Sequence, residues 1–297
     1  MPTKITLIFF CLALAACSAV KTVDEKGKPL PLARKYQSGE KNKYKMKLDY
    51  FENGKRKYSA ESLAEVKVST NAAGTFYEEF RWKSFTRDGK KVKLDAAARN
   101  FRLNLSLEPS YTISIPADLA KVRTLVQPIT DTMAFYVDMQ LAIKKAMALK
   151  PGERLDIRHG EPNSWAGGPY KVGCDCVDFE LTLTKLGRDY GVLNARHVPP
   201  GRVCGTPPAL WMEKAMDGSF PNWYQVRSLG DGNYAAGYAT EIFENEIKFS
   251  LKDGRILSAT QDNTVKGQVS YCLDPGLVNC GAPGKIDIRR KIVFSAD

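Results

Sequence analysis

The sequence predicts a mainly β protein, built on one large curved antiparallel sheet with a single long helix packed against it. Apolar and polar residues alternate through most of the chain, as they do in half-buried strands. Turn signals such as Asn53-Gly54 and Asp253-Gly254 separate the alternating runs. Only residues 131–150 have a helical apolar period over a long stretch. A chain of 297 residues with 43% hydrophobic residues is long enough to bury such a core.

The first residues predict export. Lys4 precedes the apolar run Ile5–Ala13, which is typical of a secretory signal and too short to span a membrane. Leu14-Ala15-Ala16-Cys17 resembles the lipobox of bacterial lipoproteins. The resemblance implies that residues 1–16 are a signal peptide and that Cys17 carries a diacylglycerol. It also implies a location in the bacterial cell envelope, and Ser18 favours the outer membrane, facing the periplasm. The alternative is an ordinary cleaved signal in which Cys17 has no role.

The rest of the chain divides into a tether and one domain. Residues 17–43 are predicted to be the lipid anchor and a flexible tether, because they are polar and contain Pro29 and Pro31. Residues 44–297 are predicted to form a single β-rich domain. It consists of a first β meander at 44–127, the helix at 131–150 and a second β half at 153–297.

The first meander contains five alternating runs joined by short turns, so neighbouring runs are expected to pair. The residues that share a face in successive runs are Tyr44, Met46, Leu48 and Tyr50; Tyr58, Ala60, Ala64, Val66 and Val68; Phe76, Phe80 and Trp82; Phe101, Leu103, Leu105 and Leu107; and Tyr111, Ile113 and Ile115.

The predicted helix has two apolar sides. Its broad stripe holds Phe135, Met139, Ala142, Ile143, Ala146 and Leu149, and its narrow strip holds Ala134, Val137, Leu141 and Ala148. Thr130 or Asp131 is expected to cap its start, and Pro151-Gly152 to end it. The helix should therefore touch protein or ligand on two sides.

The second half predicts further strands around an irregular segment. Phe179, Leu181 and Leu183 alternate with polar residues, and other strands are expected near 192–198, 223–227, 234–244, 246–251, 256–262 and 285–294. Residues 199–222 are rich in proline, with a short helix expected at Trp211–Met216.

A curved sheet that holds a helix on its concave face, with the phrase Lys252-Asp253-Gly254-Arg255-Ile256, resembles the open half-barrel of bacterial lipoprotein carriers and related envelope lipoproteins. The resemblance implies a hydrophobic cavity for an acyl chain or lipid between sheet and helix. The residues expected to line it are Phe80, Trp82, Leu103, Leu105, Phe135, Met139 and Leu141.

The cysteines predict disulfides, since an exported chain reaches an oxidising compartment. Cys272 and Cys280 enclose a turn-forming Asp274-Pro275-Gly276 and are expected to pair. Cys204 is expected to pair with Cys174 or Cys176, which leaves one thiol over. A redox or metal site with His159 or His197 is disfavoured, because the zinc spacing C-x2-C is absent.

No catalytic residues, metal or cofactor are predicted. The chain has no G-x-S-x-G elbow and no glycine-rich phosphate loop. His159 and His197 are expected in a loop or at a strand end. The acidic pairs Asp175/Asp178 and Glu78/Glu79 are interpreted as solvated charge.

The net charge of +11, from 44 Lys and Arg against 33 Asp and Glu, is consistent with attraction to anionic surfaces or with a lysine-rich sheet face. The basic residues are dispersed, so nucleic acid is not a predicted partner. The first hypothesis is a lipid-anchored envelope protein that binds or carries an apolar ligand. The second is a structural or partner-binding lipoprotein with a filled core, and an enzyme is third. A large cavity beneath the helix would favour the first, and dense packing there with an exposed apolar patch elsewhere would favour the second.

Overall fold

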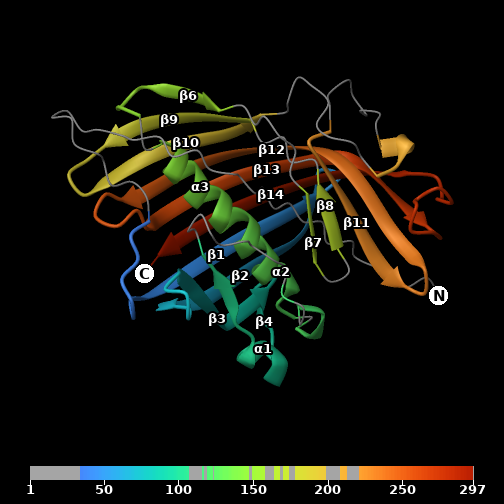
Figure 1. The fold of residues 1–297 in the computed structure, drawn as a ribbon, viewed down its shortest axis with the longest axis horizontal. Helices are drawn as coiled ribbons and strands as arrows, with labels where there is room; N and C mark the ends of the chain where they lie inside the picture. The colour runs from blue at the N-terminus through green and yellow to red at the C-terminus, as the bar shows by residue number, and fades with distance from the viewer. Residues whose placement is uncertain are drawn as a thin grey trace.

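The described residues form one large open sheet, and every strand pair among them is antiparallel (Figure 1). The computed structural model describes residues 34–106, 116, 119–122, 124–146, 149–157, 164–167, 170–173, 178–198, 208–212 and 221–296. The main strand order is β4-β3-β2-β1-β14-β13-β12-β10-β9-β6. The predicted fold class, mainly β with one large antiparallel sheet, is confirmed.

The first half is the predicted meander. β1 (Lys41–Glu52), β2 (Lys55–Thr70) and β3 (Phe76–Arg87) pair in order, and β4 (Lys90–Lys91) and β5 (Leu103–Leu105) both pair with β3. Asn53-Gly54 and Asp88-Gly89 have positive φ at both residues, the geometry that lets a two-residue turn follow the twist of the strands. A short helix, α1 (Ala96–Asn100), precedes β5. The fifth predicted run, with Tyr111, Ile113 and Ile115, lies outside the described residues, and so does Leu107 of the fourth.

The second half supplies the remaining strands. They are β6 (Arg154–Ile157), β7 (Ser164–Gly167), β8 (Tyr170–Gly173), β9 (Asp178–Leu186), β10 (Tyr190–Val198), β11 (Trp223–Gly230), β12 (Asn233–Ser250), β13 (Ile256–Cys272) and β14 (Gly284–Ala296). The predicted strands 234–244 and 246–251 are one strand, β12. Glu244 is exposed and Asn245 buried, so the alternation continues through a polar stretch that the sequence suggested was a break. Of the short helix expected at Trp211–Met216, the structure describes only Trp211 and Met212, which belong to a 3-10 turn at Leu210–Met212.

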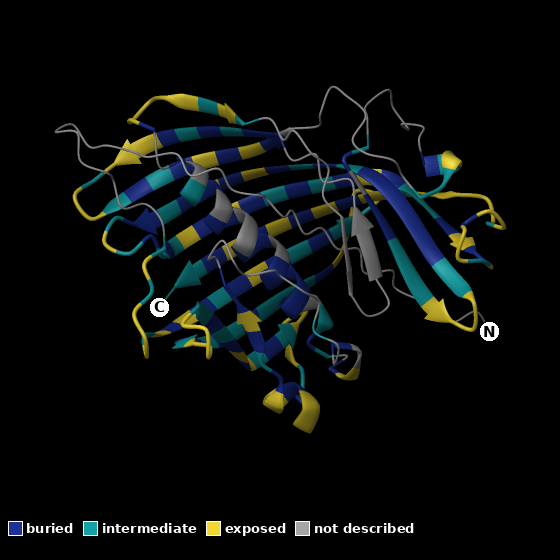
Figure 2. Ribbon diagram, viewed as in Figure 1, coloured by how far each residue is buried: buried dark blue, intermediate teal, exposed yellow. Residues whose placement is uncertain are grey.

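The two halves join through β14, which pairs with β1 on one side and β13 on the other. Ile292, for example, lies opposite Leu48 of β1 and Gln261 of β13. Buried and exposed residues alternate along these central strands (Figure 2), so one face of the sheet carries the core and the other faces solvent. A single core cluster extends across both halves of the chain.

The prediction of one long helix at 131–150 is wrong. The helical segment consists of α2 (Val126–Asp131), a π-helical turn at Thr132–Tyr136, and the nine-residue α3 (Val137–Lys145). It begins earlier than predicted because Pro128 lies in the first turn of α2, where its missing N–H needs no partner. Thr130 and Asp131 are therefore inside α2 and buried, and neither caps the helix.

The regular helix is interrupted beside Thr132. Its hydroxyl donates a hydrogen bond to the Pro128 carbonyl at 2.7 Å, a side-chain bond that competes with the backbone ladder and tends to bend helices. α3 then ends at Lys145, before the Pro151-Gly152 turn. It lies against β10 and β12 and crosses the sheet (Figure 1). None of the helices described is long and apolar enough to cross a membrane.

Candidate functional site

The residues predicted to line a ligand cavity come together in the core between the sheet and the helical segment. Those described are 1–2% exposed and belong to one cluster: Phe80, Trp82, Leu103, Leu105, Phe135 and Met139. The ring centroids of Phe80 and Trp82 lie 6.3 Å apart, and those of Phe80 and Tyr136 lie 5.4 Å apart. A side chain that lines a water-sized void keeps accessible surface, so these six are packed against protein. The side chain of Leu141 lies outside the described residues.

The π-helical turn sits between two buried charged clusters. Its last two residues contact different clusters: Tyr136 contacts the one around Glu78, and Phe135 the one around Arg290. The Tyr136 hydroxyl donates to Glu78 Oε2 at 2.5 Å, while the Arg290 guanidinium lies 4.9 Å from the centroid of the Phe135 ring. π-Helical turns occur frequently at functional sites, because an extra residue redirects neighbouring side chains. Here the turn links the helix to charges on β3 and β14.

The first cluster is built around Glu78, which is fully buried. Arg34 Nη2 lies 3.2 Å from Glu78 Oε1 and 2.9 Å from Glu40 Oε1, and the Arg34 side chain is itself only 2% exposed. Burial raises the pKa of the Glu78 carboxyl, and Arg34 and the Tyr136 hydroxyl offset this only in part. The interpretation of Glu78 as solvated charge is wrong. Its position in β3 places it on the inner face with Phe80 and Trp82, where Arg34 and Tyr136 compensate it.

The second cluster joins the three central strands. Arg290 of β14 lies 3.0 Å from Glu241 Oε1 of β12, and Arg290 Nε donates to Asn263 Oδ1 of β13 at 2.7 Å. Asn263 Nδ2 completes the triangle by donating to Glu241 Oε1 at 2.6 Å. All three side chains are buried. Mutual hydrogen bonding of this kind lets a charged pair persist inside a core, and the pair then constrains the register of the strands.

The other predicted chemical residues do not form a catalytic arrangement among the described residues. His197 is buried near the end of β10 between Phe179 and Phe243, with ring centroids 5.8 and 4.7 Å away, which confirms its expected strand-end place. Asp178 is buried at the start of β9, so its interpretation as solvated charge is wrong. In the described part of the chain, no group of three His, Cys, Asp or Glu side chains could hold a metal ion. The remaining candidates lie outside the described residues: Cys17, His159, Cys174, Asp175, Cys176 and Cys204.

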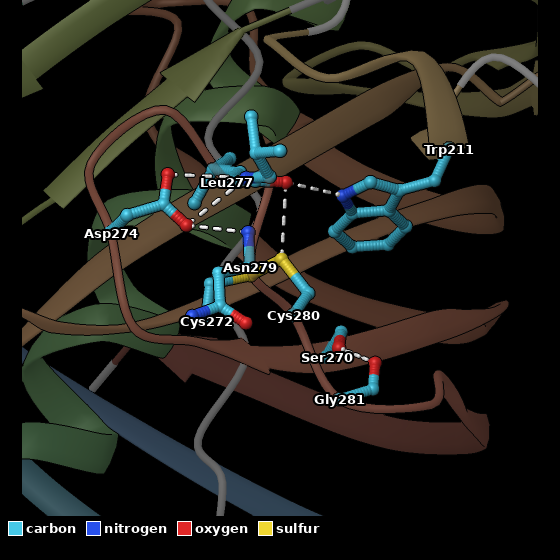
Figure 3. The surroundings of a disulfide bond; sticks show 9 residues. Trp211, Ser270, Cys272, Asp274, Leu277, Asn279, Cys280 and Gly281 are labelled. Atoms are coloured by element: carbon cyan, nitrogen blue, oxygen red, sulfur yellow. Dashed lines mark hydrogen bonds between the residues drawn. A yellow bond between two sulfur atoms is a disulfide. The ribbon is translucent and has the colours of Figure 1, made fainter.

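The predicted disulfide between Cys272 and Cys280 is present, and it closes a short hairpin at the end of β13 (Figure 3). The Asp274 carboxylate accepts backbone N–H bonds from Asn279 at 2.6 Å and Val278 at 3.1 Å. These bonds, with that from Asn279 the strongest, lower the pKa of Asp274. Trp211 Nε1 donates to the Leu277 carbonyl at 3.1 Å and ties residues 208–212 to the hairpin. The disulfide, the Asp274 carboxylate and the Trp211 hydrogen bond together fix the shape of the hairpin.

Apolar side chains project into solvent from these two segments. Val278 is 89% exposed, Leu210 81% and Leu273 65%, and Tyr271 is also exposed. Directly beneath them Met212, Cys272 and Leu277 are buried in a small second core. We call Leu210, Tyr271, Leu273 and Val278 the apolar hairpin surface. This surface was not predicted from the sequence, although a disulfide loop of this length has too few residues to cover its own Leu273 and Val278.

Comparison with known proteins assigns no family. No protein-family model matches the chain. No curated protein matches it either.

Proposed function

We propose that this protein is a lipid-anchored bacterial envelope protein that binds a protein partner through the apolar hairpin surface. The observation that carries the proposal is the exposure of Val278, Leu210 and Leu273 on a hairpin braced by a disulfide, by Asp274 and by Trp211. Soluble proteins rarely gather large apolar side chains in solvent unless another surface covers them.

The energetics favour binding at such a surface. Burying one Leu or Val side chain against a partner would contribute roughly 1.5–3 kcal/mol. A loop already fixed in shape loses little conformational entropy on binding, so more of that free energy appears as affinity. The hairpin is fixed through Cys272–Cys280 and the Trp211–Leu277 hydrogen bond.

The location rests on separate support. The lipobox-like Leu14-Ala15-Ala16-Cys17 provides the anchor at Cys17, and Ser18 favours the outer membrane, facing the periplasm. A disulfide such as Cys272–Cys280 persists in an oxidising compartment and is rare in the cytosol.

A carrier of an apolar or lipid ligand is the second candidate, and one observation favours it. Asn245 of β12 lies opposite Gln261 of β13, both are buried, and neither side-chain amide has a hydrogen-bond partner among the described residues. Buried amides normally bond to protein, water or ligand, so a lipid polar group would satisfy them. The dense packing of the six predicted lining residues weighs against this candidate.

Photocrosslinking in the native envelope tests the partner-binding proposal. A photoreactive amino acid is placed at Val278 or Leu273, and at Val293 as the control, since Val293 is a half-exposed valine on the outer face of β14. We expect one discrete protein adduct from Val278 and Leu273 and none from Val293. Palmitate labelling of the same cells should mark the wild type and leave Cys17→Ala unlabelled.

The matched variants are Val278→Glu and Val293→Glu. Val278→Glu should abolish the adduct formed from Leu273, whereas Val293→Glu should leave it unchanged. The absence of a discrete adduct at both hairpin positions, or equal adducts at Val293, would refute a partner at the hairpin. An unlabelled wild type would separately refute the lipid anchor.

A further inference from the structure

A positively charged groove lies on the solvent-facing side of β1, β2 and β3. Its volume is about 560 Å³, and its charged lining consists of Lys41, Lys43, Lys67, Arg81, Glu65 and Glu79. The residues that alternate with them along the strands, such as Tyr44, Val66 and Phe80, belong to the core on the other side. The groove is thus separate from the core beneath the helical segment.

The strand register brings these cations together. Lys43 of β1 lies opposite Glu65 of β2, which lies opposite Arg81 of β3. In the adjacent row, Lys41 lies opposite Lys67, which lies opposite Glu79 of β3. Like charges placed directly opposite one another across strands repel, so the Lys41–Lys67 pair gains from an anion placed over it.

The two carboxylates of the groove are each paired outside it. Glu65 Oε2 lies 3.1 Å from Lys83 Nζ, and Glu79 Oε1 lies 3.8 Å from Arg102 Nε. By contrast, the cations Lys41, Lys43, Lys67 and Arg81 have no carboxylate within 4.0 Å in the described part of the chain. The groove therefore carries four cations against two carboxylates, and each of these carboxylates also pairs with a cation outside the groove.

The groove also lies where the chain enters the fold. Residues 34–40 run beside it: Gly39 N–H donates to the Val68 carbonyl, and Val68 N–H donates to the Glu40 carbonyl. Lys41 follows directly as the first residue of β1. Only residues 18–33 separate Cys17 from Arg34, and a chain of that length reaches at most about 55 Å. A lipid on Cys17 would keep the entry of the chain into the fold within that distance of the bilayer.

The apolar hairpin surface lies at the far end of the sheet. Lys35 N–H donates to the Asp253 carbonyl, at the turn that precedes β13, and Cys272 ends that strand. A 17-residue strand spans about 55 Å, so the two surfaces are separated by about the full length of the sheet. A membrane at the groove would therefore lie at the opposite end of β13 from the hairpin.

We propose that the groove formed by Lys41, Lys43, Lys67 and Arg81 binds the anionic phospholipid headgroups of the bilayer that holds the Cys17 anchor. This inference rests on the proposed lipid anchor. Lysine acts as a point charge towards phosphate, and each cation near an anionic bilayer strengthens binding about fivefold. Contact with headgroups would orient the sheet on the membrane.

Amine labelling of the full, lipid-anchored protein tests the proposal. The protein is reconstituted into vesicles of phosphatidylcholine alone or mixed with phosphatidylglycerol, and flotation first reports whether it is anchored. Acetylation is then measured by mass spectrometry. We expect Lys41, Lys43 and Lys67 to be several-fold less acetylated in the vesicles that contain phosphatidylglycerol. The exposed Lys266 and Lys285, on β13 and β14, should be acetylated equally in both. High salt should remove the difference.

Variants and a soluble anion complete the test. Lys43→Glu/Lys67→Glu should abolish the phosphatidylglycerol-dependent protection of Lys41, and Lys266→Glu/Lys285→Glu, with the same change of charge, should keep it. Equal acetylation of the groove lysines in both vesicles, with the protein floating, would overturn the proposal alone. Equal protection by inorganic phosphate without vesicles would overturn it in favour of a soluble anion. Failure of the protein to float would overturn both the proposed lipid anchor and the proposal that the groove binds the bilayer holding it.

Discussion

The Glu78 carboxylate connects two segments that are far apart in the sequence. It accepts a hydrogen bond from Tyr136 at the π-helical turn and pairs with Arg34, which lies just before β1. Arg34 also pairs with Glu40 and lies over the Tyr36 ring, at 5.0 Å from its centroid. The entry of the chain into the fold and the helical segment are therefore held by the same buried acid.

Arg34→Ala should destabilise the protein by about 3–5 kcal/mol at neutral pH, because it leaves a buried carboxylate without its cation. Without Arg34 the pKa of Glu78 lies still further above its ordinary value. Since the folded pKa then exceeds the unfolded one, stability falls as the pH rises through the folded value. Urea denaturation should show the loss shrinking as the pH is lowered towards about 4.5, the ordinary value for Glu.

Glu78→Gln in the Arg34→Ala background is the control. It replaces the unpaired carboxylate with a neutral amide of similar shape, so it should recover much of the lost stability and remove the pH dependence. A double variant no more stable than Arg34→Ala, or a loss independent of pH, would show that Arg34 does not act through Glu78.

The sequence predicts the inner face of β3 but not the state of Glu78. Alternation with Phe80 and Trp82 gives its direction, since side chains two residues apart share a face. Its partners Arg34 and Tyr136 are 44 and 58 residues away, so no local pattern reveals them. For the same reason the Glu241–Arg290–Asn263 cluster could not be foreseen from any single strand.

At the scale of elements, the hairpin closed by Cys272–Cys280 is fixed by the side chain of Asp274. Asp274 holds the backbone N–H groups of Val278 and Asn279, and these bonds need the ionised carboxylate. The apolar hairpin surface should therefore depend on the charge of a residue that does not belong to it.

Acid should loosen this hairpin. The folded pKa of Asp274 is lowered below the ordinary value of 3.8, so its contribution is complete above that value and is lost as the pH falls through the lowered one. In NMR titrations, the amide signals of Val278 and Asn279 should shift at a pH below 3.8. Asp274→Asn does not titrate and should abolish this shift; the same shift in that variant would point to another group.

The helical segment shows where periodicity misleads. Phe135, Met139, Ala142 and Ile143 are buried as their spacing predicted. The predicted boundaries of the helix are wrong. The helical segment starts at Val126, with Pro128 in its first turn, and not at residue 131, and Thr132 interrupts it. The apolar period specifies which side packs inwards, whereas single polar side chains decide where the hydrogen-bond ladder breaks.

At the scale of the molecule, the packing of the interior distinguishes a partner-binding protein from a ligand carrier. We expect native mass spectrometry, with lipid extraction, of the soluble domain purified from its envelope without detergent to show the chain alone. The six packed residues around Phe80 leave little room for an acyl chain. A stoichiometric lipid that is lost in Asn245→Leu/Gln261→Leu would instead establish the carrier function.

Strand existence was predictable, but strand order was only partly so. Turns such as Asn53-Gly54 fixed the neighbours β1, β2 and β3 from the sequence alone. The pairing of β1 with β14 joins residues about 240 positions apart, and alternation carries no information about such partners. The length of β12 was likewise hidden by its polar stretch around Asn245.

The central position of β14 in the sheet has a consequence for how the chain folds during its synthesis. Ribosomes make a chain from its N-terminus. One edge of β1 and one edge of β13 therefore have no strand to pair with until residues 284–296 have been synthesised. Bare strand edges invite pairing with other chains. A protein assembled in this way stays incomplete through most of its synthesis. It also makes the last strand the step at which misassembly is either avoided or begins.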